Sequence, residues 1–432
     1  MKGYREYNNM TSTKRGYDVI TLLCCIYPVY VFISYFQARG ILPPAYAPGN
    51  GYLIWPLRLI IIIVGFRMLI RNFTKMRLFT LFFFLSIFSV VAYLYNDRPF
   101  ELYAYEILYY VVPMLMFYVG IDKGDNSDRF FKSIFISWMI CFAIGLYLYI
   151  ARPIWYQEAF TINYNSAWFR DAYYDTNQIF AHMRFASFFF NPYTTQYFCI
   201  YLLPYSLSLL LKSDDKFNRY CYLFSSLFLL AIAMLSMQRA AIFDCLLITI
   251  VFLYYSFSRG RKASYLLFVG VIIGVIVVLS LAGSIIGEQV GERLLQMNLD
   301  DAFNESRVDQ NVSTLSIWHH YLFGEGIGAA GGEARRFGYI GITDGNYTKI
   351  LVEQGIVGSF LFILLLILSF FRAFKNFKYL SVECCIVGGM MVAFVGSSAL
   401  IMSMWCPPFW YALGRIWNKE YLKYLKSSDN KI

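Results

Sequence analysis

The chain has 432 residues, of which 59% are hydrophobic and 15% are charged, and its formal net charge is +10. Soluble domains usually carry about 25% charged residues. The apolar residues gather in runs of about 17–25, the length that crosses a hydrocarbon core. One soluble core cannot bury so many helices that are apolar on every side. The composition therefore excludes an ordinary soluble protein and predicts an all-α, polytopic membrane protein. In such a protein, the positive charge is better explained by membrane topology than by nucleic-acid binding.

About twelve transmembrane helices are expected, and the distribution of Lys and Arg orients them. Every connection predicted on the side of the N-terminus holds at least three Lys or Arg residues, whereas the short turns on the opposite side hold at most one. The positive-inside rule then places both termini in the cytoplasm. From the N-terminus onward, the predicted spans are residues 19–36, 52–70, 78–95, 103–121, 133–151, 193–211, 220–237, 240–257, 263–282, 347–371, 380–401 and 403–418.

Two of the predicted outer connections are long. Residues 152–192 form a first long extracytoplasmic loop, and residues 283–346 form a second, larger one just before the tenth span. Long loops in a compact fold usually carry function. We therefore expect one integral membrane domain, residues 1–432, whose chemistry lies on the outer side. The first apolar run is too long for a cleaved signal and lacks a small-residue cleavage site, so it is expected to remain as an anchor.

Neither a disulfide framework nor a metal site is expected. The nine cysteines lie in or at the ends of apolar runs, and no CxxC pair occurs. His319 and His320 lack carboxylate or cysteine partners at the spacing of metal ligands. The glycines at 324–331 contain a formal GxGxxG, but no strand precedes them, so a dinucleotide site is not expected. These glycines are expected instead to form a tight, close-packed turn.

Three arginines on the outer side, Arg184, Arg239 and Arg307, are the main candidates for binding an anionic group. A guanidinium group presents a fork of donors that matches phosphate oxygens, and it stays charged. Outer arginines next to a span also run against the positive-inside rule. The alternative for each one alone is an interface arginine, whose stem lies along apolar surface while its head stays in water.

Polar residues mark the start of the tenth span. Asp344 or Asn346 would cap this helix well. The alternative for Asp344 is a general base held near the arginines, and His320 is a second candidate for that base. Lys349 and Glu353 are one helical turn apart and can pair. A charge pair inside a span is either structural or functional, and both interpretations stay open here.

Three segments together resemble the bacterial O-antigen polymerase and O-antigen ligase superfamily. They are residues 184–192, the turn at residues 236–240, and a longer stretch that runs from Arg307 through residues 324–328 and 344–347 to Gly355 and Gly358. The match covers roughly residues 184–371. It departs from the family at Ser187, where members have glycine. It also departs at Asp344, where ligases have histidine, and this second difference favours the polymerase branch.

The resemblance implies transfer of a growing glycan from undecaprenyl pyrophosphate to a carrier-linked repeat unit, on the extracytoplasmic side of the bacterial inner (plasma) membrane. The bond from sugar to pyrophosphate is already activated, so no metal, nucleotide or other cofactor is implied. The implied partners are the lipid-linked oligosaccharide, membrane lipid and a chain-length regulator protein, and no nucleic acid. The implied site residues are Arg239 and Arg307 for the pyrophosphate, with Arg184 assisting on donor or acceptor. Asn191 and Tyr347 are expected to bind the substrate, and Asp344 is the preferred base, with His320 second.

Three other functions remain as alternatives. A ligase would join finished polysaccharide to the lipid A-core with the same donor chemistry. A transporter or lipid flippase would place charged residues along a central path, for which Arg58 and Asp244 are the clearest candidates. A peptidoglycan glycosyltransferase of the shape-and-division type would share the lipid-pyrophosphate chemistry, but the glycine pattern before the tenth span fits that class less well.

Overall fold

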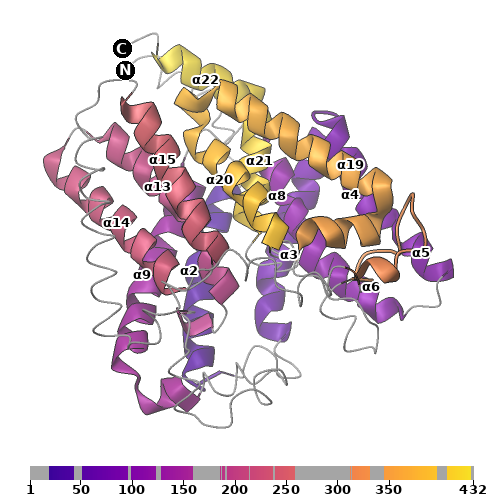
Figure 1. Ribbon diagram of the computed structural model, residues 1–432, viewed down its shortest axis with the longest axis horizontal. Coiled ribbons are helices and arrows are strands. Elements are labelled where there is room, and N and C mark those ends of the chain that lie inside the picture. The colour runs from indigo at the N-terminus through magenta and orange to yellow at the C-terminus, as the bar shows by residue number, and fades with distance from the viewer. Residues whose placement is uncertain are drawn as a thin grey trace.

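The computed structural model describes residues 19–42, 51–95, 99–122, 128–158, 185, 187–189, 192–213, 215–236, 239–257, 312, 314–330, 345–396 and 406–429. Within these ranges the regular elements are all helical, and no strand occurs among them (Figure 1). The helices are α2 (Val19–Ala38), α3 (Gly51–Asn72), α4 (Arg77–Phe88), α5 (Val90–Tyr95), α6 (Phe100–Glu106), η1 (Ile107–Val111), α7 (Val112–Met114), α8 (Met116–Gly120), α9 (Arg129–Ala151), η2 (Ser187–Phe189), α13 (Pro192–Lys212), α14 (Lys216–Leu235), α15 (Arg239–Phe257), α19 (Asn346–Lys375), α20 (Phe377–Gly396), α21 (Pro407–Trp417) and α22 (Lys419–Asp429).

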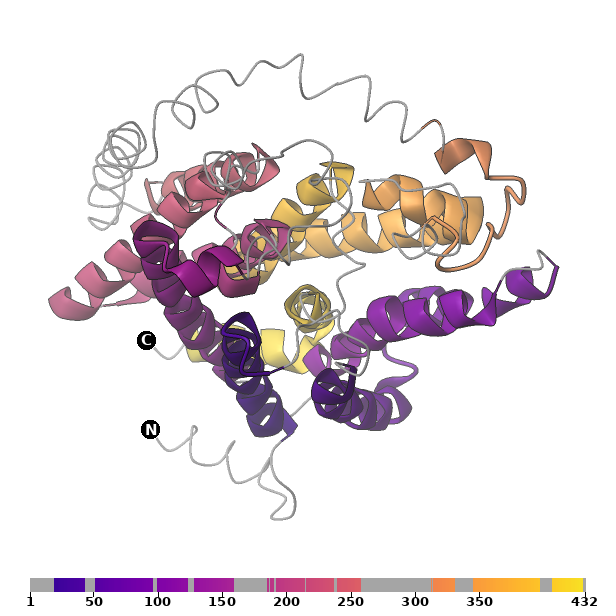
Figure 2. The ribbon, with the colours of Figure 1, turned by 90° about the horizontal axis from the view of Figure 1, so that it is seen from below.

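The helices form two groups with a shared centre. Helices α13, α14 and α15 pack on one another on one side of the molecule, and α4 packs against α19 on the other (Figures 1 and 2). Helix α20 lies between the groups and contacts α13, α15 and α19, while α21 packs on α8 and α20. Residues from the first and last thirds of the sequence therefore meet on the side of α4 and α19.

Several helices are long and apolar enough to cross a membrane. Among the described residues these are α9, α14, α19 and α20. Helix α19 carries an exposed apolar row at the spacing of one helix face, as a lipid-facing surface requires. The row consists of Ile356, Phe360, Ile363, Ile367 and Phe371. The count of twelve spans stays a prediction, and its ninth span, residues 263–282, lies outside the described residues.

Helix α21 differs from the predicted span at 403–418. It begins at the Pro407–Pro408 pair and has eleven residues, which extend for about 16 Å and cannot alone cross a core of about 30 Å. Its residues from Pro407 to Ile416 are buried. Gly120 of α8 lies so close to Gly414 that an added Cβ at Gly414 would lie 3.1 Å from the Gly120 Cα. Helix α21 is therefore an internal helix. Its small residues let it pack backbone to backbone against α8.

Ser187, at the position where the resembling family has glycine, adopts a left-handed backbone conformation with φ of 50°. This conformation costs a residue other than glycine about 1–2 kcal/mol. The Ser187 hydroxyl donates to the Cys141 carbonyl over 3.1 Å, and its own carbonyl accepts from the Tyr156 hydroxyl over 2.9 Å. These bonds offset the backbone cost and hold η2 against α9, where Gly145 leaves space for the serine.

Replacing Gly145 with alanine is expected to lower stability by about 1–3 kcal/mol, the cost of overpacking a core. The new Cβ would lie 2.8 Å from the Cβ of Ser187 and 2.9 Å from its Cα. Adding Ser187→Gly should recover part of the loss, because it removes the clashing Cβ and hydroxyl. Thermal unfolding of the purified protein in detergent measures both effects. A double variant less stable than the sum of the single effects would contradict this packing.

Candidate functional site

Three of the expected spans are interrupted, and the three interruptions lie close to one another. These interruptions were not predicted from the sequence. The span expected at 78–95 breaks at Ser89, between α4 and α5. The span expected at 103–121 widens into the π-helical turn η1, where Val112 N–H donates to the Ile107 carbonyl, because Pro113 has no N–H to continue the α-helical pattern. Helix α19 is broken at Gly355, with φ of 66° and ψ of −168°. Non-helical backbone at membrane depth persists only where it is buried in protein or lines a cavity.

The break in α19 is closed by the segment that precedes the helix. A helix break leaves carbonyls before it and N–H groups after it without partners in the helix. Backbone groups of residues 321–326 form hydrogen bonds with the unpaired backbone groups of residues 352–357. The bonds are Glu325 N to Val352 O at 2.8 Å, Gly326 N to Glu353 O at 3.0 Å, Ile356 N to Tyr321 O at 2.9 Å, and Val357 N to Leu322 O at 3.1 Å.

The glycines make this close approach sterically possible. Gly324, Gly326 and Gly328 have φ of 75°, 92° and 92°, a region that favours glycine. A Cβ on Gly324 would lie 2.5 Å from the Gln354 nitrogen, and a Cβ on Gly355 would lie 2.6 Å from the Gly324 nitrogen. The predicted tight, close-packed glycine turn is confirmed.

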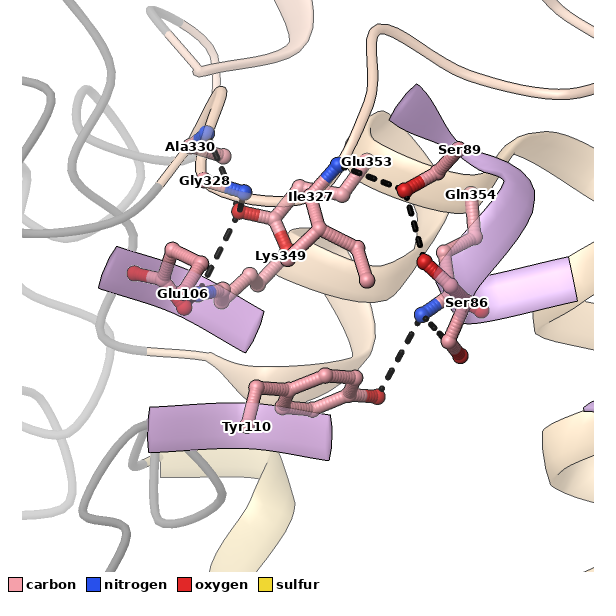
Figure 3. Close-up of polar contacts among 10 residues, drawn as sticks. All are labelled: Ser86, Ser89, Glu106, Tyr110, Ile327, Gly328, Ala330, Lys349, Glu353 and Gln354. Atoms are coloured by element: carbon pink, nitrogen blue, oxygen red, sulfur yellow. Dashed lines mark hydrogen bonds and ion pairs between the residues drawn. The ribbon is translucent and has the colours of Figure 1, made fainter. Parts of the chain in front are cut away.

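A buried charged cluster lies beneath this turn (Figure 3). Lys349 Nζ lies 3.2 Å from Glu353 Oε1 and 3.2 Å from Glu106 Oε2, and the three side chains are at most 1% exposed. Glu353 Oε1 also accepts from Gly328 N at 2.9 Å and Ala330 N at 3.2 Å. The expected Lys349–Glu353 pair is confirmed. Glu106 was not singled out from the sequence, although a carboxylate in an apolar span is a signal that a partner exists.

Polar side chains of α4 and η1 extend the cluster. Gln354 Nε2 donates to Ser86 Oγ at 3.1 Å and lies 3.5 Å from the Tyr110 hydroxyl (Figure 3). The hydroxyl of Ser89, at the break after α4, accepts a hydrogen bond from the Ile327 N–H over 3.3 Å. The interruptions of α4 and α19 are thus both joined to the glycine turn, the first through the Ser89 hydroxyl and the second through backbone hydrogen bonds that replace those missing within α19.

An apolar groove of about 840 Å³ runs beside the cluster. The ends of α4 and α5 form one wall, and residues 319–324 form the other. Several lining side chains are exposed, so the groove is open to the exterior of the protein. His319 and His320 lie in this lining, and the carboxylate of Glu325 accepts from their backbone N–H groups at 2.6 and 2.8 Å. The lining residues are Leu85, Phe88, Ser89, Val91, Ala92, His319, His320, Tyr321, Leu322, Phe323 and Gly324.

Two of the resembling segments meet in the structure. The Phe185 N–H donates to the Leu235 carbonyl over 3.0 Å, which joins the 184–192 segment to the end of α14, just before the 236–240 turn. Arg239 begins α15, but its side chain lies outside the described residues. The remaining predicted site residues outside the described ranges are Arg184, Asn191, Arg307 and Asp344.

The start of α19 corrects one expectation. The N-cap residue of the helix is Gly345, which has no side chain to cap it, so Asn346 is not the N-cap. Asn346 is instead inside the helix and completely buried. Tyr347 donates from its hydroxyl to the Met391 carbonyl over 2.9 Å and packs on Phe362 and Phe394, so in this structure it joins α19 to α20.

No family model matches this chain, and no curated protein is significantly similar to it. The site is therefore interpreted from its own residues. Within the described parts of the chain, no three His, Cys, Asp or Glu side chains gather as a metal site would require. What the arrangement offers is a buried ionic cluster and an open apolar groove with two exposed histidines in its lining.

Proposed function

We propose that this protein is a membrane-embedded glycosyltransferase of the O-antigen polymerase type. It moves a growing glycan from undecaprenyl pyrophosphate to a carrier-linked repeat unit on the outer face of the bacterial inner membrane. The observation that carries the proposal is the open apolar groove with His319 and His320 in its lining, beside a buried polar cluster. A substrate with a long hydrocarbon tail and a hydroxyl-rich head requires these two environments side by side.

The proposed chemistry assigns roles to the residues singled out in the sequence. The bond between sugar and pyrophosphate breaks, the acceptor hydroxyl oxygen forms the new glycosidic bond, and a base takes its proton. Arg239 and Arg307 stabilise the negative charge that develops on the pyrophosphate, and Arg184 assists. Asp344 is the preferred base. His320 is the second candidate, and its place in the groove lining supports it.

Replacing Arg239 with alanine is expected to lower polymer formation by roughly 100-fold or more, because a fixed cation at the leaving group is lost. The measurement is a gel of surface polysaccharide from a deletion strain that carries the wild-type or the variant gene, with protein levels matched in the membrane. A ladder that collapses to one repeat unit in the deletion strain identifies a polymerase. Full activity of the Arg239 variant would remove its assigned role.

Arg152 provides a matched control on the same predicted side. It follows α9, has no part in the resembling segments, and is expected to tolerate alanine with an unchanged ladder. Two other results would redirect the proposal. Loss of all attached glycan, with polymer retained on the carrier, would identify a ligase. An unchanged ladder in the deletion strain would remove the polymerase function and favour a transporter.

A further inference from the structure

A buried carboxylate holds the two exposed histidines of the groove. Oε1 of Glu325 accepts from the backbone N–H of His319 at 2.6 Å and from that of His320 at 2.8 Å. Both histidines are exposed and line the groove, whereas Glu325 is only 2% exposed. A carboxylate that accepts backbone N–H groups forms strong, charge-assisted hydrogen bonds. Glu325 therefore fixes the main chain of two residues whose side chains border the groove.

Glu325 is itself attached to the broken helix α19. Its N–H donates to the Val352 carbonyl over 2.8 Å, and the N–H of the next residue, Gly326, donates to the Glu353 carbonyl over 3.0 Å. These bonds fill positions that the break at Gly355 leaves open. Because the main chain of Glu325 is fixed to α19, its carboxylate can hold the histidines at a constant place beside the groove.

His320 is held at both of its backbone groups. Its N–H donates to Glu325, and its carbonyl accepts from the Gly324 N–H over 2.8 Å. The carbonyl of the next residue, Tyr321, accepts from the Ile356 N–H over 2.9 Å. The main chain at His320 is therefore fixed on both sides, and its imidazole moves only by rotation about side-chain bonds. Such a fixed position suits a group that must meet a substrate within about 0.5 Å.

We propose that Glu325 is a positioning residue, which holds His320 so that its imidazole takes the proton of the acceptor hydroxyl. This role rests on the proposed function and on His320 as its base. The unprotonated imidazole nitrogen accepts the proton while the hydroxyl oxygen attacks the sugar carbon that carries the pyrophosphate. The bond from that carbon to the pyrophosphate breaks, and the lipid pyrophosphate leaves with the bonding electrons. The imidazolium group then releases the proton to water, so His320 is regenerated.

The test combines Glu325→Ala with His320→Ala in a double-mutant cycle. The measured quantity is the initial rate of polymer formation by the purified protein, supplied with carrier-linked repeat units. Glu325→Ala should lower this rate roughly 100-fold, the effect of moving a reacting group by about 1 Å. His320→Ala should lower it roughly 100-fold or more, the contribution of a general base. The double variant should be no slower than His320→Ala, because the carboxylate acts only through the imidazole.

Glu325→Gln separates the hold on the backbone from the negative charge. Its amide oxygen can accept from the same two N–H groups, so the rate should stay close to that of the wild type. A Glu325→Gln variant as slow as Glu325→Ala would show that the charge matters rather than the position, and would overturn the role. Asp215 supplies the matched control, since its carboxylate also accepts a backbone N–H, from Asn218 at the start of α14. Asp215→Ala should leave the rate unchanged.

Other outcomes would overturn this role in different ways. If Glu325→Ala slows the His320→Ala protein by the same factor as the wild type, the carboxylate serves folding. If His320→Ala works at the wild-type rate, the base role returns to Asp344 and the proposed function stays intact. Where Glu325→Ala does not accumulate, Glu325→Asp, which is shorter by one methylene, replaces it in the cycle, and failure of both to accumulate overturns the role. An unchanged ladder in the deletion strain instead overturns the proposed function itself.

Discussion

Replacing Lys349 with methionine is expected to destabilise the protein by about 3–5 kcal/mol, because removing one partner leaves buried charge uncompensated. The ammonium lies 3.2 Å from both Glu106 and Glu353, and the side chains have almost no contact with solvent. Glu353 also holds the glycine turn through Gly328 and Ala330. Loss of the cation should therefore weaken the attachment of that turn to α19. Thermal unfolding of the purified protein in detergent, or the yield of folded protein from membranes, measures the effect.

A charge-neutral triple variant separates the missing charge from the missing packing. Combining Lys349→Met with Glu106→Gln and Glu353→Gln removes all three charges and retains similar volumes. Removing all three charges together leaves no uncompensated buried charge, which is the main cost of removing one partner alone. The triple variant should therefore recover most of the loss. If Lys349→Met alone is as stable as the wild type, the cluster is not held by an ion pair.

Gly355→Ala is expected to destabilise the protein by about 3–5 kcal/mol, the combined cost of a glycine-only backbone conformation and an overpacked contact. The alanine Cβ would lie 2.5 Å from the carbonyl carbon of Leu322 and 2.6 Å from the Gly324 nitrogen. Both neighbours are backbone atoms held by the interlocking hydrogen bonds, so they cannot move without breaking those bonds. The groove wall at residues 319–324 should be displaced, and the proposed polymerase activity should fall with stability.

Gly40→Ala is the control for backbone strain alone. Gly40 also has a positive φ, 73°, but a Cβ there would meet no described atom within 4 Å. Its replacement should cost about 1 kcal/mol. The difference between the two melting temperatures then reports the close approach at Gly355 together with the additional strain of its ψ of −168°. Equal effects would show that the contact with residues 322–324 is not tight.

Local sequence was enough to predict most helices, because an apolar run of sufficient length becomes a helix wherever it is buried or meets lipid. The spans expected at 193–211 and 240–257 correspond to α13, Pro192–Lys212, and α15, Arg239–Phe257. The glycine turn and the Lys349–Glu353 pair were also predictable. A positive φ selects for glycine locally, and residues four apart share one helix face.

The interruptions and the third member of the cluster could not be predicted in the same way. The break at Gly355 is stable because residues 321–326, outside the helix, supply the missing backbone hydrogen bonds. Glu106 pairs with a lysine 243 residues away, and no periodicity connects them. Helix formation depends on neighbours within a few residues, whereas compensation of a buried charge or a broken helix depends on which segments the fold brings into contact.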